Sequence, residues 1–552
     1  MALKESSPAI EPPAPLGQQV VEATLIFALF FLFAGGQPPG VNESHYLCKA
    51  KHYWNPTWCE NDYFLKSSDA HAMFYWTCGW LTKFTSLSAT AWIGRAAVWL
   101  LQAWAWQRLS WAVVPRPLYA LLSAGVFLAL IRNFHMAGEW VVGDVEAKGF
   151  AYVFVVLGLE ALVRQRWHWV FPLLGAGAAF HVIVGGWAVI AAAVAWLALR
   201  RWQSAQKETP SFTSLVPSLA LGFLLSLPGL LPCVLLDRGT PPEIVAQGNV
   251  AYVYARLSHH LVINRIPWQF IARHLMLIAV TAGVAYRWRN DTTVQRLMGF
   301  TGGAILLAAI GAGIDQSLLY ASDELRAKLL RFYWYRLSDS IVPVALALLL
   351  CRFAAGLVGR SKAMAPNRAL VAGLIALATW NIVDVKLIRW SLGVPEAELR
   401  LGISDAASIS LRQRHYDWLQ CCYWIRNRTP QEATFLTPRT QQTFLWYAER
   451  AEVVNWKNCP QDAQGVVEWL KRYEDVYPHP SGEQIMFGPA IDPALPQQER
   501  LQKLAAKYGA TFIVVDRLSE SAPLNLAPVY PLGDEFNISF AVYRVPQPGP
   551  SR

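Results

Sequence analysis

Long apolar segments separated by short polar ones fill residues 20–390, whereas residues 391–552 mix apolar and charged positions as soluble domains do. A membrane-spanning helix needs about 20 mostly apolar residues, and fewer where the rest of the protein shelters it. The pattern therefore predicts a polytopic α-helical membrane protein with about eleven spans, which are Val20–Gly35, Ala89–Trp111, Leu118–Phe134, Phe150–Val163, Trp169–Ile183, Trp187–Leu199, Leu215–Leu236, Phe270–Ala285, Leu297–Ile314, Ile341–Leu357 and Leu370–Ile388.

The two segments between Trp169 and Leu199 are short, and arginines stand on both sides of them, at 164–166 and 200–201. Loops rich in arginine and lysine are typical of the cytoplasmic side. Both ends of the pair should therefore be cytoplasmic, which requires either two crossings or a re-entrant hairpin. The hairpin would turn near residues 184–186, Val-Gly-Gly.

The distribution of basic residues predicts the orientation of the whole chain. One set of loops carries most of them: Arg116, Arg164, Arg166, Arg200, Arg201, Lys207, Arg287, Arg289, Arg296, Arg360, Lys362 and Arg368. We expect these loops to be cytoplasmic. The long loops 36–88, 135–149, 237–267 and 315–340 then face outward. An odd number of spans makes residues 1–19 a cytoplasmic tail, 20–390 the transmembrane domain and 391–552 an extracytoplasmic domain.

The first apolar segment has two interpretations. It is short and ends in small residues at 34–36, Ala-Gly-Gly, as a cleaved signal peptide would. Its leader is Pro-rich and acidic, however, and Lys4 is the only basic residue in it. This composition favours an uncleaved signal-anchor.

Residues 391–552 alternate between extended and helical patterns. The candidate strands are Ala433–Leu436, Glu452–Trp456, Thr511–Val515, Val529–Leu532 and Ser539–Val545. The candidate helices are Ser408–Arg426, Gln441–Arg450, Ala463–Tyr473 and Gln498–Tyr508. Alternation of this kind predicts a small α/β domain that ends in a hairpin near Gly533.

Composition agrees with a membrane protein. Of 552 residues, 54% are hydrophobic and 16% are charged, against about 25% charged in ordinary soluble domains. The 25 tryptophans suit aromatic belts at two membrane interfaces. The net charge of +10 does not indicate nucleic-acid binding, because the basic residues lie mainly in short loops between spans. The eight cysteines form no CxxC pair. Disulfides within each outer region and buried free thiols both remain open.

The first outer loop, residues 36–88, carries ionisable residues directly after the first span. They are Glu43, His45, Asp62, Asp69 and His71. Ionisable groups are costly near hydrocarbon, so such a cluster at the membrane boundary favours a functional role. The loop opens with the sequence Asn-Glu-Ser-His-Tyr-Leu at residues 42–47.

This arrangement resembles the GT-C superfamily of membrane glycosyltransferases, and within it a bacterial branch without assigned activity. The likeness rests on the short first span, the acidic residue before His45 and Tyr46, the many spans and the outer α/β domain. It implies an inverting hexosyl or pentosyl transferase in the bacterial cytoplasmic (inner) membrane. Such an enzyme takes a sugar from a polyprenyl-phosphate donor and passes it to a lipid, glycan or protein acceptor at the outer face.

An acceptor hydroxyl is a weak nucleophile, and a carboxylate within hydrogen-bond reach can take its proton as the sugar transfers. The resemblance points to Glu43 as this catalytic base, with Asp62 and Asp69 as alternatives. Asp69 also precedes a predicted helix and fits an N-cap. The nearby His45, Tyr46 and His71 are candidates for binding the donor.

The second outer loop holds Glu139, Asp144, Glu146 and Lys148 within ten residues. By the same resemblance, these three carboxylates would bind a divalent metal or position the acceptor. Carboxylate oxygens suit Mg²⁺ or Mn²⁺. The alternative is an ion-pair network around Lys148.

Two further loops supply cationic candidates for the donor phosphate. Loop 237–267 carries Arg256, His259 and His260. Adjacent histidines on a helix point about 100° apart, so they act singly rather than as a chelating pair. Arg331 and Arg336 flank four aromatic residues before the tenth span. An arginine there can clamp a phosphate bidentately or can snorkel in an aromatic belt.

Two other functions compete with the transferase. A transporter or flippase of lipid-linked glycans predicts ionisable residues within helices and an internal repeat. This chain has no repeat, and its acidic residues gather in outer loops. A catalytically inert relative that only binds a cell-envelope partner is the other alternative. His181, alone in an apolar run, is interpreted as a core histidine.

Overall fold

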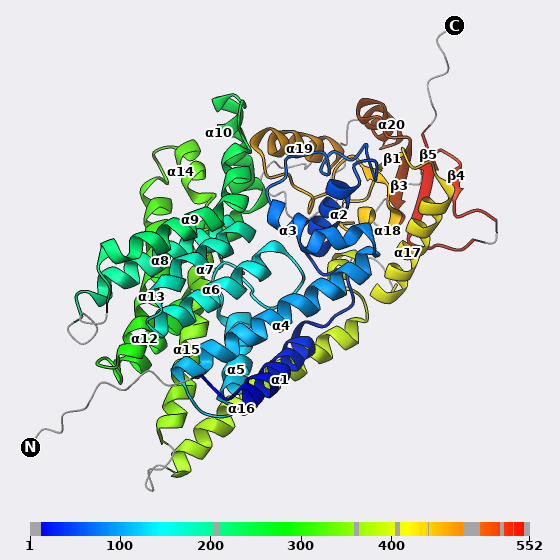
Figure 1. Ribbon diagram of the computed structural model, residues 1–552. Coiled ribbons are helices and arrows are strands. Elements are labelled where there is room, and N and C mark those ends of the chain that lie inside the picture. Colours follow the sequence, from blue (N-terminus) through cyan, green and yellow to red (C-terminus); the bar gives the residue numbers. More distant parts are fainter. Residues whose placement is uncertain are drawn as a thin grey trace, which may run out of the picture.

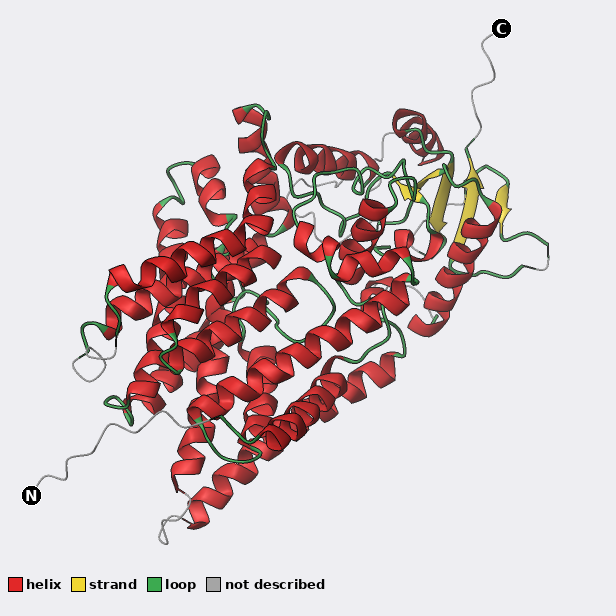
Figure 2. Ribbon diagram, viewed as in Figure 1, coloured by secondary structure: helices red, strands yellow, loops and turns green. Residues whose placement is uncertain are grey.

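The computed structural model describes residues 13–202, 209–357, 364–402, 409–439, 441–477, 497–518, 524–533 and 535–545. Most of the chain is helical, and one small sheet lies at the end of the molecule where the chain's last elements gather (Figures 1 and 2). Lys207, Arg360 and Lys362, which contribute to the predicted basic loops, lie outside the described residues, as do residues 1–12 of the predicted tail.

Each predicted span corresponds to one helix. The helices are α1 (Leu16–Ala34), α4 (Leu87–Val113), α5 (Tyr119–Phe134), α6 (Ala147–Val163), α7 (Trp167–Phe180), α8 (Val182–Leu199), α9 (Phe212–Leu235), α12 (Trp268–Tyr286), α13 (Thr292–Ser317), α15 (Arg336–Leu357) and α16 (Met364–Leu392). Seven of them are long and apolar enough to cross a membrane: α1, α8, α9, α12, α13, α15 and α16. Helix α15 lies in the middle of the bundle, because 83% of its most apolar stretch is buried.

The break between α7 and α8 differs from the predicted turn at residues 184–186. The two helices are joined by the single residue His181, whose extended backbone (φ −147°, ψ 101°) interrupts the helical path. Gly185 instead lies inside α8, where a β-carbon would come 2.1 Å from the backbone nitrogen of Ala178. The glycine therefore permits close packing of α7 on α8 rather than a turn.

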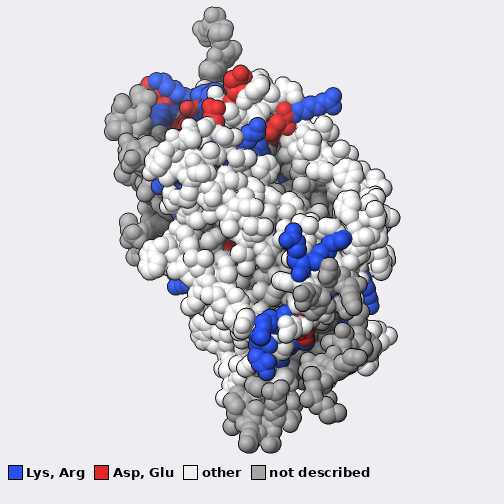
Figure 3. Space-filling view, turned by 90° about the vertical axis from the view of Figure 1, so that its left-hand side faces the viewer, with Lys and Arg blue, Asp and Glu red and all other residues white. Residues whose placement is uncertain are grey.

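The outside of the bundle is apolar. Large exposed hydrophobic side chains cover α9 and α12, among them Phe223, Leu224, Leu275 and Met276. On the face shown in Figure 3, charged side chains gather at the upper end and in basic patches of the lower half, and the surface between them is largely uncharged. Such a band is what a protein needs to lie in a bilayer.

The long loops that were expected on one side fold into short helices. Residues 36–88 form α2 (Glu43–Trp54), α3 (Ala72–Trp76) and the 3₁₀ turn η1 (Cys78–Lys83). Residues 237–267 form α10 (Pro242–Val250), the π-helical turn η3 (Ala251–Arg256), α11 (Ser258–Leu261) and η4 (Ile263–Arg265). Helix α14 (Asp323–Leu330) precedes α15, and η6 (Glu396–Gly402) follows α16.

The C-terminal α/β domain has the elements that the sequence predicted. Its strands are β1 (Thr434–Leu436), β2 (Ala451–Glu452), β3 (Phe512–Asp516), β4 (Pro528–Tyr530) and β5 (Phe540–Arg544), in the order β2-β1-β3-β5-β4. Its helices are α17 (Leu411–Arg428), α18 (Phe444–Ala448), α19 (Ala463–Val476) and α20 (Gln497–Tyr508). Strands β1, β2 and β3 are parallel, and β4 and β5 form the expected antiparallel hairpin. Strand β2 ends before the predicted Trp456.

The first outer loop packs against this domain. Leu47 and Phe74 share a buried apolar cluster with Leu445 and Trp446 of the C-terminal domain. Lys51 makes an ion pair of 3.0 Å with Glu449. All eight cysteines are free thiols and seven are buried, so the buried-hydrophobe interpretation holds. The candidate site lies between the helical bundle, the first loop and the segment that follows β2.

Candidate functional site

A polar chamber of about 480 Å³ lies between the helical bundle and the C-terminal domain. Its walls come from six separate parts of the chain. They are residues 41, 42, 45 and 46, residues 137–140 with Glu146 and Lys148, His181, residues within 252–260, the pair Tyr333 and Arg336, and residues within 456–461. Among the predicted site residues, the polar chamber brings together His45, Tyr46, Glu139, Glu146, Lys148, Arg256, His259, His260 and Arg336.

Glu43 does not line the polar chamber. Its carboxylate is fully buried and accepts two hydrogen bonds from the guanidinium of Arg95, at 2.5 and 2.7 Å. It also accepts from the backbone N–H groups of Gly40 and Val145, at 2.8 and 3.1 Å. With four donors already bound and no solvent access, this carboxylate ties α2 to α4 and to the second outer loop. The position of Glu43 therefore does not support the prediction that it is the catalytic base.

The two alternative bases also have structural partners. The buried carboxylate of Asp62 accepts from the backbone N–H groups of Leu65 and Glu452, so it fastens the first outer loop to β2. Burial raises the pKa of Asp62 to about 6. Asp69 pairs with Lys49 at 3.5 Å, and the N-cap position of α3 belongs to His71, whose side chain makes no capping hydrogen bond. The prediction that Asp69 is an N-cap is therefore wrong.

The second outer loop forms an ion-pair network around Lys148. The ammonium of Lys148 lies 3.4 Å from Glu139 and 3.2 Å from Glu146, and 4.1 Å from the centre of the Trp140 ring. Glu139 also pairs with Arg336 at 2.9 Å and accepts from the hydroxyl of Tyr152. This is the alternative that the sequence left open beside a metal site.

The three carboxylates proposed as metal ligands do not converge. Asp144 faces Arg95 at 3.5 Å, away from the pair formed by Glu139 and Glu146 with Lys148. Over the described ranges, no group of three or more His, Cys, Asp or Glu side chains is arranged to hold a metal ion. The arrangement of Glu139, Asp144 and Glu146 therefore does not fit a site for Mg²⁺ or Mn²⁺.

Arg336 is the best-placed cation in the polar chamber. It begins α15, pairs with Glu139 and lies 3.2 Å from Nε2 of His181. Its guanidinium stacks 3.9 Å above the ring of Tyr333. Tyr333 has a left-handed backbone (φ 52°), which turns the aromatic run 332–335 back toward the chamber. A non-glycine residue in this region costs on the order of 1 kcal/mol, and such strain gathers at functional sites.

The opposite wall comes from η3 and from the C-terminal domain. The π-helical turn presents Tyr252 and Arg256, and π-turns inside helices occur frequently at functional sites. The guanidinium of Arg256 lies 5.1 Å from the ring centre of Trp456. Lys457 follows Trp456 in the lining.

The pKa values of three histidines at or next to the polar chamber are lowered by burial. Burial lowers the pKa of His45 and of His260 well below their usual range. Burial and the charge of Arg336 lower the pKa of His71 to about 4. His71 lies behind the wall, with Nε2 3.5 Å from the hydroxyl of Tyr46. Neutral imidazoles can hydrogen-bond sugar hydroxyls without adding positive charge.

Arg331 lies outside the chamber lining. Its guanidinium donates to Asn249 of α10 at 2.6 Å and lies 3.7 Å from Asp237. It therefore anchors α10, whereas Arg336 five residues later enters the chamber.

The sequence interpretation missed several lining residues. His181 was assigned to the core, yet it lies in the wall beside Arg336. Trp140, Tyr252 and Lys457 carry no motif of their own, and Asn42, which opens the sequence quoted for residues 42–47, was given no role. The sequence signal that could have marked His181 is its position between two short apolar segments that arginines flank.

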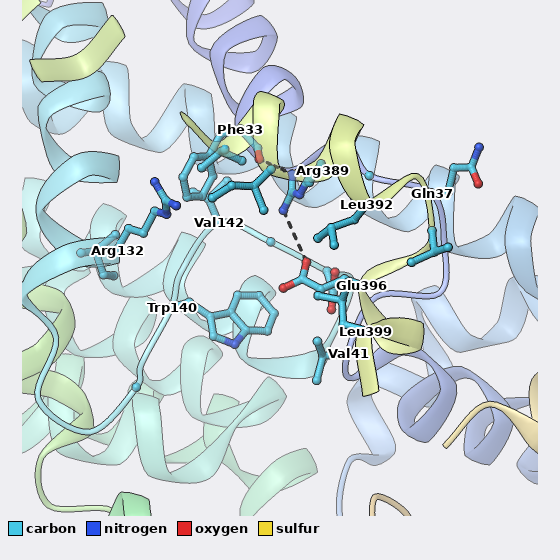
Figure 4. A pocket seen from close by; sticks show the side chains of 18 of the residues that line it. Phe33, Gln37, Val41, Arg132, Trp140, Val142, Arg389, Leu392, Glu396 and Leu399 are labelled. Atoms are coloured by element: carbon cyan, nitrogen blue, oxygen red, sulfur yellow. Dashed lines mark hydrogen bonds and ion pairs between the residues drawn. The ribbon is translucent and has the colours of Figure 1, made fainter. Parts of the chain in front are cut away.

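A second cavity, the lateral chamber, adjoins the first and has a volume of about 640 Å³ (Figure 4). It lies at the outer ends of α1, α5 and α16. Val41, Gly138, Glu139 and Trp140 line both chambers and form the wall between them.

Comparison with known proteins adds one finding. A family described as a domain of unknown function, DUF6798, matches residues 416–476, which run from α17 to α19. No curated protein matches the chain.

Proposed function

We propose that the protein is a membrane glycosyltransferase that moves a sugar from a polyprenyl-phosphate donor to an acceptor hydroxyl in the polar chamber. The observation that carries the proposal is the composition of that chamber. It combines an arginine held on an aromatic ring, Arg336, with a buried carboxylate, Glu146, that has no arginine partner among the described residues. The arginine would bind the donor phosphate, and the carboxylate would take the proton of the acceptor hydroxyl.

Glu146 replaces Glu43 as the proposed base. Of the two carboxylates that line the polar chamber, Glu139 is engaged by Arg336, Lys148 and Tyr152. Within the part of the chain that the structure describes, Glu146 pairs with Lys148 and accepts from the side-chain amide of Asn42. Burial raises the pKa of Glu146, and Lys148 opposes this rise. A base with a raised pKa takes a proton more readily near neutral pH.

The reaction needs one displacement. The acceptor oxygen forms a bond to the anomeric carbon of the sugar as the bond from that carbon to the phosphate oxygen breaks. The proton of the acceptor hydroxyl passes to Glu146, and polyprenyl phosphate leaves as an anion beside Arg336. Attack from the face opposite the phosphate inverts the anomeric centre. Aromatic side chains such as Tyr46, Trp140 and Trp456 offer flat surfaces against which a sugar ring can pack.

The remaining parts of the proposal concern topology. Eleven crossings of the bacterial inner membrane place the C-terminal domain outside the cytoplasm, next to the polar chamber. Support comes from the agreement between each predicted span and one helix, and from the positions of the loop arginines.

The test is transfer by the full-length protein purified in detergent. Radiolabelled polyprenyl-phosphate hexoses and pentoses serve as donors, and a bacterial lipid extract supplies the acceptor. We expect Glu146→Gln to lower transfer about 100-fold or more, as loss of a general base does. Glu60→Gln is the matched control, because Glu60 is an exposed glutamate of the first outer loop outside the lining. Equal transfer by wild type and Glu146→Gln would refute the role of Glu146. Absence of transfer from every donor would refute the transferase.

A further inference from the structure

The lateral chamber opens toward the surface that faces the bilayer. Its lining residues Ile388 and Leu399 are 45% and 37% exposed. Helix α16, which supplies Val385, Ile388 and Arg389 to the lining, lies at the periphery of the bundle, because only 17% of its most apolar stretch is buried. A molecule dissolved in the membrane can therefore reach the chamber from the side.

The walls of the lateral chamber are amphipathic. Phe33, Ile131 and Val385 form an apolar side at the ends of α1, α5 and α16. Arg132, at the end of α5, and Arg389, at the end of α16, lie on either side of Phe33 and Val142 (Figure 4). A volume of about 640 Å³ lies within the range of small-ligand sites. It suits a lipid headgroup and the first part of its chains, with the remainder left in the bilayer.

The two arginines are available to a headgroup. Arg389 donates to the carbonyl of Phe33 and lies 3.4 Å from Glu396. Arg132 pairs with Asp384 at 2.7 Å. Both carboxylate partners are more than a third exposed, and such ion pairs exchange for another anion at little cost. Arginine binds phosphate bidentately, so the chamber fits a phosphate-bearing headgroup.

The lateral chamber adjoins the polar chamber across a shared wall. Trp140 and Glu139 line both cavities, and Gly138 turns the loop between them with a positive φ of 79°. A headgroup that enters beside Arg389 therefore ends next to the site where the proposed donor loses its sugar.

We infer that the acceptor is a phosphate-bearing membrane lipid, held in the lateral chamber with its hydroxyl directed past Trp140 into the polar chamber. This inference rests on the proposed function, and it names the acceptor class that the transferase uses. Soluble glycans and proteins are excluded by it as direct acceptors.

The first experiment measures binding independently of transfer. The full-length protein is reconstituted in phosphatidylcholine vesicles that contain phosphatidic acid with a diazirine in its acyl chain. After irradiation, we expect label on peptides that contain residues 131–144 or 385–399. Arg389→Gln should lower this labelling about tenfold, as the loss of a charge-assisted hydrogen bond does. Leu399→Trp should fill the entrance and lower it as well.

The control is Arg273→Gln, which removes an exposed arginine near the start of α12 that lines neither chamber. Labelling should not change in this variant. Millimolar inorganic phosphate should not compete with the lipid. Competition by phosphate as strong as by unlabelled phosphatidic acid would show a site for soluble anions and overturn the inference, as would label confined to other helices.

The second experiment identifies the product. Mild acid releases sugar from a phosphate-linked donor but not from a glycoside formed on a lipid hydroxyl. We expect an organic-soluble, acid-stable product, reduced in Arg389→Gln and Leu399→Trp. A water-soluble product would overturn the lipid acceptor while leaving the transferase intact. Labelled lipid in the chamber together with no transfer from any donor would overturn both the acceptor role and the proposed function.

Discussion

Replacing Glu43 by glutamine should destabilise the protein rather than remove a catalytic base. Glu43 and Arg95 form a bidentate pair in which both side chains are at most 1% exposed. Removing one partner of a buried pair costs about 3–5 kcal/mol. Asp144, 3.5 Å from Arg95, remains in the variant and offsets part of the lost charge. We therefore expect about 3 kcal/mol, at the lower end of that range.

The assay is unfolding in detergent micelles, followed by tryptophan fluorescence, for wild type, Glu43→Gln, Arg95→Gln and the double variant. The double variant should lose less than the sum of the two single variants, with a coupling free energy of about 2 kcal/mol or more. Glu499→Gln is the control, because Glu499 pairs with Lys503 on the exposed face of α20. Its cost should stay below about 1 kcal/mol.

The result that would refute this reasoning is specific. If Glu43→Gln abolished sugar transfer while the free energy of unfolding stayed within about 0.5 kcal/mol of wild type, then Glu43 would act in the chemistry. Transfer restored in the double variant would instead support the structural role, because a missing base cannot be replaced by removing Arg95.

Three further predictions concern the polar chamber and the domain contact. Arg336→Lys keeps the charge but loses the planar fork of the guanidinium, so the KM for the donor should rise about tenfold or more. An unchanged KM would contradict the assignment of Arg336 to the donor site. Because burial raises the pKa of Glu146, transfer should fall as pH drops through a midpoint above 4.5. Lys148→Met should move that midpoint higher, because the ammonium of Lys148 opposes the rise. A pH profile unaffected by Lys148→Met would contradict this prediction. The pKa of Asp62 rises from 3.8 to about 6 on folding, so the folded state holds this proton more tightly. The stabilisation of the folded state by protonated Asp62, about 3 kcal/mol, is therefore fully present below pH 4 and is lost as pH rises to about 6. Unfolding free energies measured across this range should vary less in Asp62→Asn, and an equal slope would show that Asp62 does not titrate there.

The spans and the C-terminal elements could be predicted because they depend on local properties of the chain. A run of apolar residues with the length of a bilayer predicts a helix wherever the helix packs. Alternating patterns likewise predicted all five strands of the sheet. The error at residues 184–186 came from interpreting Gly185 as a turn residue, although it serves helix packing.

The assignment of chemistry to individual acids could not be made from the sequence. Asn42 and Glu43 are neighbours, but successive side chains on a helix point about 100° apart. Asn42 donates to Glu146 in the polar chamber, and Glu43 faces Arg95 behind it. Which of the two side chains faces the polar chamber depends on how α4 and the second outer loop pack around residues 42 and 43.

The sequence by itself determined the helical bundle, the order of its elements and the outer loops that carry ionisable groups, because hydrophobic length and period are written locally along the chain. The tertiary structure alone decided which of those groups meet. Arg336, His181 and Glu139 converge from three distant segments, and Trp456 and Lys457 complete the wall from a separate domain. Contacts between residues hundreds of positions apart are set by how helices and domains pack, and local pattern carries no record of that packing.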